Sequence, residues 1–300
     1  MKNVLSCDQY TRESLEKVLV LAEKIKNNPK AFSKVLDGKI VAVMFFEPST
    51  RTRMSFESAI QRLGAKMIVT ENAMSNSSTT KGETLEDTIR VIEGYADAIV
   101  MRHRENDAAE RAAKVSKLPI LNAGSGSGEH PTQAMLDMFT IKEKHGKIDG
   151  IKVAVLGDLK YGRTIHSLIK LLSLYKDVTI YGLSKKEFAL PEEYVEFLKE
   201  KGTKYVVCNS FDEIPSDVQV LYHTRIQSER FEGDFGKEEF IVNKEVLNKF
   251  SKDTILLHPL PRVNEISTDV DDDDRAMFFK QAHNGVWTRM ALLIQAFGIE

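Results

Sequence analysis

The most concentrated chemistry in the chain is a cluster of hydroxyl and arginine side chains at residues 49–53, within the stretch FFEPSTRTRMSFE. An apolar run precedes the cluster and a helical apolar pattern follows it, so it lies where a strand leads into a helix. Backbone N–H groups and the positive end of the helix dipole converge there and favour a phosphate. A helix cap with solvated arginines is the alternative. Arg53 is expected to be structural, because side chains two apart on a helix face different ways.

A second cluster, HPTQ, combines an imidazole with an amide. Pro131 suits the first position of a helix, which places His130 near the helix cap. Gln133 follows three residues later and lies on the same face as His130. The pair can offer a donor and an amide to one ligand, although a structural histidine is the alternative. We expect structural roles for other histidines of the chain: His103, His145, His166, His223 and His283.

A third stretch, GDLKYGRT at residues 157–164, is one residue away from a nucleotide-binding phosphate loop. Arg163 stands where that loop has a lysine, which removes the compact charge that reaches the β and γ phosphates. No aspartate clearly follows an apolar strand to hold magnesium. A nucleotide-binding protein is therefore a weaker alternative.

The composition limits the possible partners. The 300 residues are 42% hydrophobic and 29% charged, and they suffice for two domains. With 42 Lys and Arg against 44 Asp and Glu, the net charge of -2 gives no overall cationic field for nucleic acid. The longest apolar run, residues 41–46, is too short to cross a membrane, and the N-terminus lacks the apolar core of a signal peptide. We expect a cytoplasmic protein with neither nucleic-acid nor membrane partners.

The sequence does not predict a metal site. Cys7 and Cys208 lie far apart and in no metal-ligand spacing, so both are expected to be reduced thiols. The acidic run at residues 269–276 lacks the alternating spacing and closing glutamate of a calcium loop, and a solvated loop is expected there.

Strand-like apolar runs alternate with helical patterns along the chain, which predicts an α/β fold with parallel sheets. The glycines and charges of KHGKIDG, residues 144–150, indicate a boundary. We therefore expect two domains, residues 1–146 and 147–284, each a parallel sheet flanked by helices, with bridging helices that include residues 131–145. Residues 286–297 form a further helical pattern that follows the second set of strands.

Polar side chains follow almost every predicted strand, at the point where ligands bind to open α/β sheets. The stretches that follow strands include PSTRT, Arg102 with His103, GSGSGEHPTQ, DLKYGRT, TRIQ and LPR. This arrangement favours a site for small, highly charged anions.

Seven short stretches of the chain have the order and spacing found in one family. They are FFEPSTRTRMSFE, KGETLEDT, MRH, HPTQ, GDLKYGRTIHS, TRIQ and HPLPR. The chain resembles the catalytic chains of aspartate carbamoyltransferases over essentially its whole length. The resemblance implies a carbamoyl-phosphate domain, an aspartate domain and a last helix, residues 285–300, that returns to the first domain. It also implies a catalytic homotrimer, possible regulatory chains, and chemistry that needs no metal, nucleotide or covalent enzyme intermediate.

The resemblance assigns the carbamoyl-phosphate site residue by residue. Thr52, Arg102 and His130 would polarise the carbonyl, as an oxyanion hole does. Gln133 and the backbone carbonyl of Leu260, which the family joins to Pro261 by a cis bond, would hold the amino group. The residues assigned to the phosphate are Ser49, Thr50, Arg51, Thr52 and Arg102.

The resemblance also assigns an acceptor site. Arg163, Arg225 and Gln227 would receive the carboxylates of aspartate, for which planar arginine is suited. Ser77 and Lys81 match a loop that enters the active site of the neighbouring subunit in this family, and Lys81 would also contact aspartate. The sequence departs from the family at Ser125, where an aspartate is usual, which leaves the rigidity of that loop and the setting of His130 open.

Two other functions stay open. Ornithine carbamoyltransferases share the phosphate half, but their late motif typically reads HCLP, whereas HPLPR, Arg225, Gln227 and Lys81 favour a dianionic acceptor here. A non-catalytic anion-binding protein of the same fold is the second, and the complete catalytic set argues against it.

Overall fold

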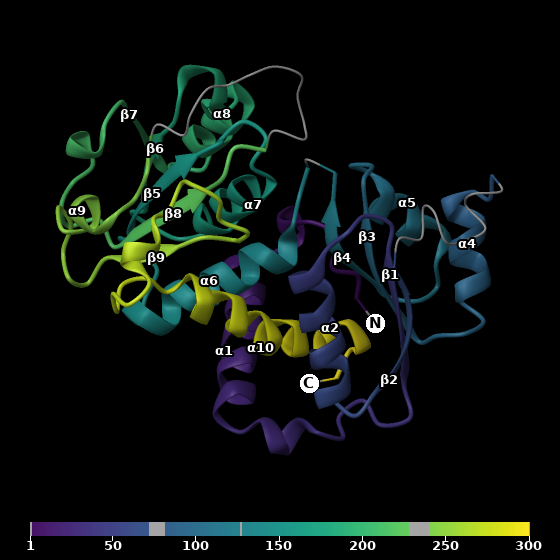
Figure 1. The fold of residues 1–300 in the computed structure, drawn as a ribbon. Coiled ribbons are helices and arrows are strands. Elements are labelled where there is room, and N and C mark those ends of the chain that lie inside the picture. Colours follow the sequence, from purple (N-terminus) through teal and green to yellow (C-terminus); the bar gives the residue numbers. More distant parts are fainter. Residues whose placement is uncertain (1, 72–81, 127, 228–239, 300) are drawn as a thin grey trace. The chain divides into compact units, whose positions relative to one another are not determined.

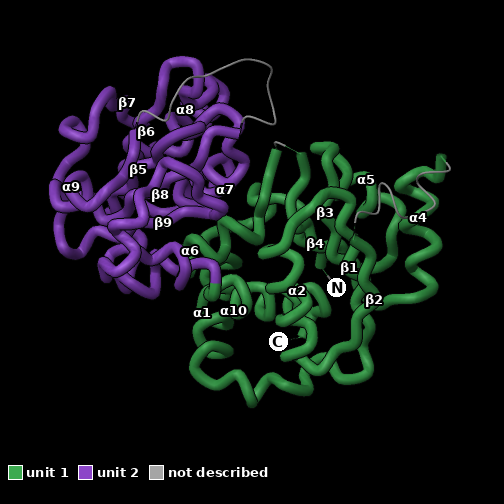
Figure 2. Tube along the Cα trace, in the orientation of Figure 1, with its two compact units in different colours: residues 1–139, 283–300 green, residues 140–282 purple. Residues whose placement is uncertain are grey.

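The computed structural model describes residues 2–71, 82–126, 128–227 and 240–299 (Figure 1). The chain divides into two compact units (Figure 2), with residues 1–139 and 283–300 in unit 1 and residues 140–282 in unit 2. Both breaks fall inside helices, α6 (Pro131–His145) and α10 (Phe278–Phe297), so continuous helices carry the chain from one unit to the other. The domain limits expected at residues 146 and 284 stay a prediction.

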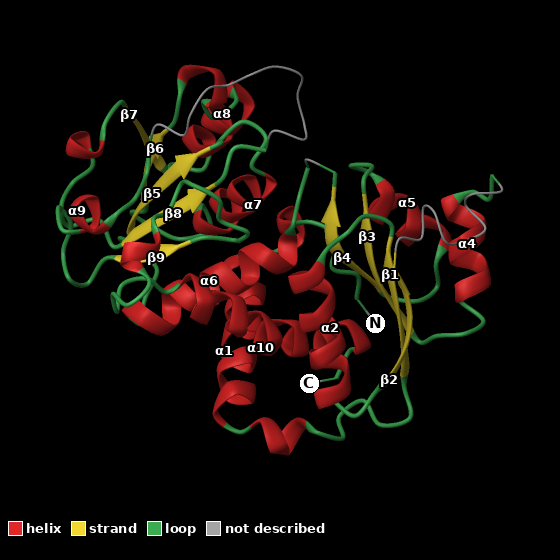
Figure 3. Ribbon diagram, in the orientation of Figure 1, coloured by secondary structure: helices red, strands yellow, loops and turns green. Residues whose placement is uncertain are grey.

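Unit 1 contains a parallel sheet whose described strands have the order β2-β1-β3-β4. Its central strands are apolar on both faces because helices cover both, as Figure 3 shows. Val43, for example, is fully buried and pairs with both Val69 and Val100. The strands are β1 (Ile40–Phe45), β2 (Lys66–Glu71), β3 (Ala98–His103) and β4 (Ile120–Ser125).

The helices of unit 1 begin where their sequences supply caps. The Thr11 hydroxyl accepts from the Ser14 N–H at the start of α1, and the Thr84 hydroxyl accepts from the Asp87 N–H at the start of α4. Gly64, at φ +84, follows the end of α2 in the left-handed conformation that suits glycine. Besides α6 and α10, the helices are α1 (Arg12–Asn27), α2 (Thr50–Arg62), α4 (Leu85–Ile92) and α5 (Ala108–Val115).

The first residues of the chain cover the outer edge of β4. Val4 forms a parallel bridge with Leu121, its N–H donates to the Ile120 carbonyl at 2.8 Å, and its carbonyl accepts from the Asn122 N–H at 2.8 Å. The Asn3 side chain accepts the Ile120 N–H at 2.9 Å. The Lys2 N–H donates to the Ala296 carbonyl at 2.9 Å and so ties this segment to α10.

Unit 2 contains a second parallel sheet, whose described strands have the order β7-β6-β5-β8-β9. One face packs on a core that includes Leu156, Leu221 and Leu256. The strands are β5 (Lys152–Gly157), β6 (Thr179–Leu183), β7 (Lys204–Cys208), β8 (Val220–Thr224) and β9 (Ile255–Leu257), and the helices are α7 (Arg163–Leu172), α8 (Glu192–Glu200) and α9 (Lys244–Leu247). Short 3-10 turns lie at Cys7–Gln9, Pro29–Phe32, Lys186–Phe188, Phe211–Glu213 and Thr268–Val270.

The predicted fold class is confirmed, since each unit is a parallel sheet flanked by helices. The last helix begins at Phe278, earlier than the pattern at residues 286–297 indicated. Polar residues such as Lys280 and His283 obscure the apolar period in its first turns. Among the described residues, none of the helices combines the length and apolar character needed to span a membrane.

Candidate active site

Each sheet has a point where the strand order reverses, and several of the predicted site residues follow the strands at these points. In unit 1 the reversal lies between β1 and β3, and in unit 2 it lies between β5 and β8. Ligands of open α/β sheets bind outside the carboxyl ends of the strands at such reversals. The residues after β1 and at the end of β3 are 49–52 and Arg102, and those after β5 and β8 are Arg163, Arg225 and Gln227.

The start of α2 is not capped by its N-cap side chain. Ser49 is the N-cap residue, with extended backbone at φ -163, and its side chain makes no capping hydrogen bond. Thr50 and Arg51 begin the helix and are exposed. Arg53 makes ion pairs within unit 1, with Nη1 2.8 Å from Glu71 Oε2 and Nε 3.7 Å from Glu57 Oε1, contacts that fit the structural role expected of it.

The beginnings of α2 and α6 meet at Thr52 and His130. Thr52 Oγ1 lies 3.4 Å from His130 Nε2, and both residues are buried. His130 directly precedes α6, as the sequence indicated, and the N–H of Gln133 donates to its carbonyl at 3.0 Å. Two of the predicted carbonyl-polarising side chains are therefore in contact.

The loop before His130 is held by its own polar groups. The Ser125 hydroxyl donates to Asn122 Oδ1 at 3.0 Å, and the Ser125 N–H donates to the Glu129 carbonyl at 3.1 Å. Ser125 is buried. The serine that departs from the family pattern thus anchors the loop from within unit 1.

Arg102 is fixed beside the α2 loop by a carboxylate that sequence analysis missed. The Phe46 N–H donates to the Arg102 carbonyl at 2.9 Å, and the Arg102 Nε–H donates to Glu47 Oε1 at 2.7 Å. The exposed fractions of the two side chains are 14% for Arg102 and 21% for Glu47, so this charge-assisted bond is partly shielded from water. A lone carboxylate next to a predicted anion loop was the signal that could have identified Glu47.

In unit 2, Asp158 ties the loop after β5 to the loop after β8. It is fully buried, and its Oδ1 accepts from the N–H groups of Lys160 at 3.1 Å and Tyr161 at 2.8 Å. Its Oδ2 accepts from the Gln227 N–H at 3.2 Å, and Gln227 Nε2 donates to the Tyr161 carbonyl at 2.8 Å. A nucleotide loop would turn such N–H groups toward phosphate, so the bonds to Asp158 argue against a nucleotide site.

The two arginines predicted for the acceptor site lie at the ends of these loops. Arg163 begins α7 and is 6% exposed, whereas Arg225 is half-buried and its Nη1 donates to the Ile226 carbonyl at 3.1 Å. Gly157, at φ +95, allows β5 to approach β8, because a side chain there would collide with the carbonyl oxygen of Thr224. The approach of β5 to β8 brings the start of the first loop close to Thr224, which directly precedes Arg225.

The segment at Leu260 has the cis bond that the family resemblance implies, between Leu260 and Pro261. The Leu260 N–H donates to His258 Nδ1 at 2.7 Å, and His258 Nε2 lies 2.8 Å from Glu265 Oε1. Burial raises the pKa of Glu265, but contact with His258 and backbone N–H groups lower it to about 2. A buried imidazole and an ionised carboxylate therefore support this loop.

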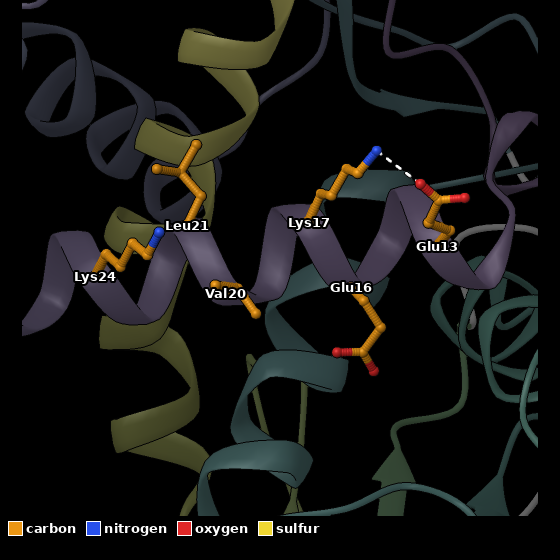
Figure 4. Close-up of a pocket in the computed structure, with 6 residues that line it drawn as sticks. All are labelled: Glu13, Glu16, Lys17, Val20, Leu21 and Lys24. Atoms are coloured by element: carbon orange, nitrogen blue, oxygen red, sulfur yellow. Dashed lines mark ion pairs between the residues drawn. The ribbon is translucent and has the colours of Figure 1, made fainter. Parts of the chain in front are cut away.

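Other sequence predictions fall outside the site or outside the described residues. Ser77 and Lys81 lie outside the described residues. Cys7 and Cys208 are buried thiols that form no disulfide, as expected. No cluster of three or more potential metal ligands occurs among residues 2–71, 82–126, 128–227 and 240–299. A shallow hollow on α1 (Figure 4) includes no predicted site residue and is lined by Glu13, Glu16, Lys17, Val20, Leu21 and Lys24.

Among the histidines expected to be structural, those with described contacts bond to backbone carbonyls, stack on aromatic rings or are at least partly buried. His166 Nε2 lies 2.9 Å from the Leu159 carbonyl oxygen, and the ring stacks on Tyr194 with centroids 4.2 Å apart. His223 Nε2 lies 2.6 Å from the Phe240 carbonyl oxygen. Burial lowers the pKa of both His103 and His145, which favours their neutral forms.

Two family models match the chain. The model described as "Aspartate/ornithine carbamoyltransferase, carbamoyl-P binding domain" matches residues 2–143, and the model described as "Aspartate/ornithine carbamoyltransferase, Asp/Orn binding domain" matches residues 149–296. An aspartate carbamoyltransferase catalytic subunit of Clostridium novyi is 45% identical over 303 residues, covering 100% of this chain and 99% of its own.

Solved structures give the same similarity. The catalytic subunit of M. jannaschii aspartate transcarbamoylase has a TM-score of 0.92 and 45% identity, covering 99% of this chain and 98% of its own. Aspartate transcarbamoylase from Trypanosoma cruzi, in complex with carbamoyl phosphate and aspartate, has a TM-score of 0.91 and 37% identity. The similarity covers 97% of this chain and 95% of the T. cruzi chain.

Proposed function

The chain belongs to the aspartate/ornithine carbamoyltransferase family, and we propose that it is an aspartate carbamoyltransferase of de novo pyrimidine biosynthesis. It transfers the carbamoyl group of carbamoyl phosphate to the α-amino group of L-aspartate and releases phosphate. The observation that carries this proposal is the pair of arginines at the strand reversal of unit 2. Arg163 and Arg225 supply two guanidinium groups for the two carboxylates of aspartate, and Gln227 adds an amide.

The carbamoyl-phosphate half is assigned to unit 1, except for Leu260 and Pro261, which belong to unit 2. Ser49, Thr50 and Arg51 bind the phosphate with the first N–H groups of α2, a favourable place for a doubly charged anion. Glu47 orients Arg102. Leu260, with Pro261, supplies the carbonyl that holds the carbamoyl amino group together with Gln133.

Catalysis rests on orientation and charge stabilisation. The uncharged amino group of aspartate attacks the carbamoyl carbon, a C–N bond forms, and the C–O bond to phosphate breaks. Thr52, Arg102 and His130 stabilise the negative charge that develops on the carbonyl oxygen. The leaving phosphate accepts the proton from the attacking nitrogen.

The assembly and the location are further parts of this proposal. The active protein is a cytoplasmic homotrimer in which Ser77 and Lys81 of one subunit complete the site of its neighbour, with Lys81 contacting aspartate. Family membership supports this assembly, as do relatives named catalytic subunits, a name compatible with additional regulatory chains.

The first experiment is a colorimetric assay for ureido product, with carbamoyl phosphate and either L-aspartate or L-ornithine and without added metal or nucleotide. Product with aspartate alone supports the assigned acceptor site. Product with ornithine alone would overturn the roles of Arg163, Arg225 and Gln227 while keeping the phosphate half. If neither acceptor gives product, the proposed function is wrong.

A further inference from the structure

We propose that Asp137 is a positioning residue that makes Gln133 present its amide oxygen, rather than its amino group, to the substrate. The inference rests on the proposed function, and it explains how unit 1 selects an acyl phosphate whose carbonyl carbon carries an amino group. Asp137 and Arg289 both lack a role in the mechanism described above. Both are nevertheless charged residues inside unit 1, at 0% and 2% exposure.

The hydrogen bond between Gln133 and Asp137 determines which way the amide points. The two residues lie one turn apart on α6, and Gln133 Nε2 donates to Asp137 Oδ1 at 2.8 Å. An ionised carboxylate can accept hydrogen bonds but has none to donate. The Gln133 amino group must therefore face Asp137, and the amide oxygen is the branch left to accept a hydrogen bond from a ligand.

Arg289 on α10 supports the charge of Asp137. Burial lowers the pKa of Arg289 to about 9, and the negative charge of Asp137 raises it, so the guanidinium is still charged at neutral pH. An opposite charge in turn favours the ionised form of a buried carboxylate. The guanidinium carbon of Arg289 lies 5.1 Å from the ring centre of Phe56 on α2, which holds the cation under the phosphate-binding helix.

The packing of α10 leaves space for this cation at one position. A side chain at Gly285 would collide with the Arg289 guanidinium and would come within 3.1 Å of Leu136 Cδ2 on α6. Gly285 thus allows the guanidinium to lie over the preceding turn of α10, next to α6. Arg289 Nε has no hydrogen-bond partner among the described residues, which is consistent with a role based on charge.

The consequence is selectivity between two donor substrates of similar shape. Carbamoyl phosphate carries an amino group that can donate to an acceptor oxygen, whereas acetyl phosphate carries a methyl group in the same place. A site with a fixed acceptor favours the first, because desolvating that oxygen without a partner is unfavourable. If the Gln133 amide could rotate, its oxygen would no longer be fixed toward the ligand, and the preference for carbamoyl phosphate over acetyl phosphate would be reduced.

The test compares the two donors in Asp137→Asn, whose side chain can donate or accept and so no longer dictates the orientation of Gln133. The KM of carbamoyl phosphate is measured with aspartate, and acetyl phosphate is measured as a competitive inhibitor, which requires no turnover of acetyl phosphate. We expect the KM to rise about tenfold or more while the Ki of acetyl phosphate changes by less than about threefold.

Two further variants separate positioning from stability. The double variant Asp137→Asn with Arg289→Met removes both charges, so it avoids an unpaired buried cation. It should show the same rise in the KM of carbamoyl phosphate, with little change in the Ki of acetyl phosphate. Thr288→Val removes a buried hydroxyl that donates to the Asn284 carbonyl within α10, and should leave the ratio of KM to Ki unchanged.

Parallel changes in KM and Ki, no change in either, or the same shift in Thr288→Val would overturn the positioning role. Wild-type protein that is inactive with aspartate would overturn the proposed function instead, so the two failures are distinguishable.

Discussion

Replacing Glu265 by glutamine should destabilise unit 2 strongly at neutral pH and less in acid. The carboxylate is 2% exposed and lies 2.8 Å from His258 Nε2. It also accepts from the N–H groups of Val263 at 3.1 Å and Asn264 at 3.0 Å. Glutamine keeps the shape but replaces one acceptor oxygen by a donor, so it cannot satisfy all of these groups.

The pKa of Glu265 gives the size of the effect. Burial raises this pKa, but contact with His258 and backbone N–H groups lower it from 4.5 to about 2. A pKa difference of one corresponds to about 1.4 kcal/mol, so the ionised carboxylate contributes roughly 3 kcal/mol to the free energy of unfolding at neutral pH. Because the folded state has the lower pKa, this contribution is complete above about pH 5 and is lost as the pH falls through the interval between the two values.

Urea unfolding followed by circular dichroism measures the effect, at about pH 7.5 and about pH 3.5. Glu265→Gln is compared with wild type and with Glu200→Gln, which neutralises an exposed carboxylate of the same unit. The difference between Glu265→Gln and wild type should shrink in acid, and the control should differ little from wild type at either pH. A loss below about 1 kcal/mol at neutral pH, or an equal loss at both, would refute the reasoning.

Three further variants test the start of α2 and the end of β5. Arg51→Ala should lower kcat/KM for carbamoyl phosphate by about a thousandfold with an unchanged circular dichroism spectrum, and near-normal turnover would disprove the phosphate assignment. Arg53→Ala should lose about 1 kcal/mol of stability in urea, from its ion pair with Glu71, and keep kcat within about threefold; a large loss of kcat would show that Arg53 has a catalytic role. Gly157→Ala should lose roughly 2 kcal/mol or more in the same unfolding assay, because of its positive φ and the collision with the Thr224 carbonyl, and a variant as stable as wild type would exclude that strain.

The sequence predicted the elements wherever local rules were sufficient. The apolar period of Leu15, Val18 and Ala22 and the cap at Thr11 can be read from the sequence of α1 alone, because amphipathic burial and capping are local properties. The candidate site residues could be proposed as a group for a related reason. Polar residues that follow parallel strands lie at one edge of the sheet, whatever the intervening helices contain.

The residues that support the site could not be predicted in the same way. The contacts of Glu47, Asp137 and Glu265 depend on which other segments of the chain lie next to them in the folded protein. Asp137, for example, acquires its opposite charge from Arg289 on a helix far along the sequence. A lone carboxylate within the apolar stretch AMLDMF was a local signal, but it could not identify the partner.

The segment at residues 3–5 also affects how unit 1 can meet other chains. A strand at the edge of a sheet exposes N–H and carbonyl groups that can pair with a strand from another molecule. Val4 already occupies those groups on β4, through Ile120 and Asn122, so that edge is closed to sheet extension at these positions. The opposite edge strand, β2, keeps partly exposed apolar side chains at Ile68 and Val69. Removing residues 3–5 would therefore open a second edge of the sheet to pairing with another chain, and it would also take Val4 and Leu5 out of the apolar packing of unit 1.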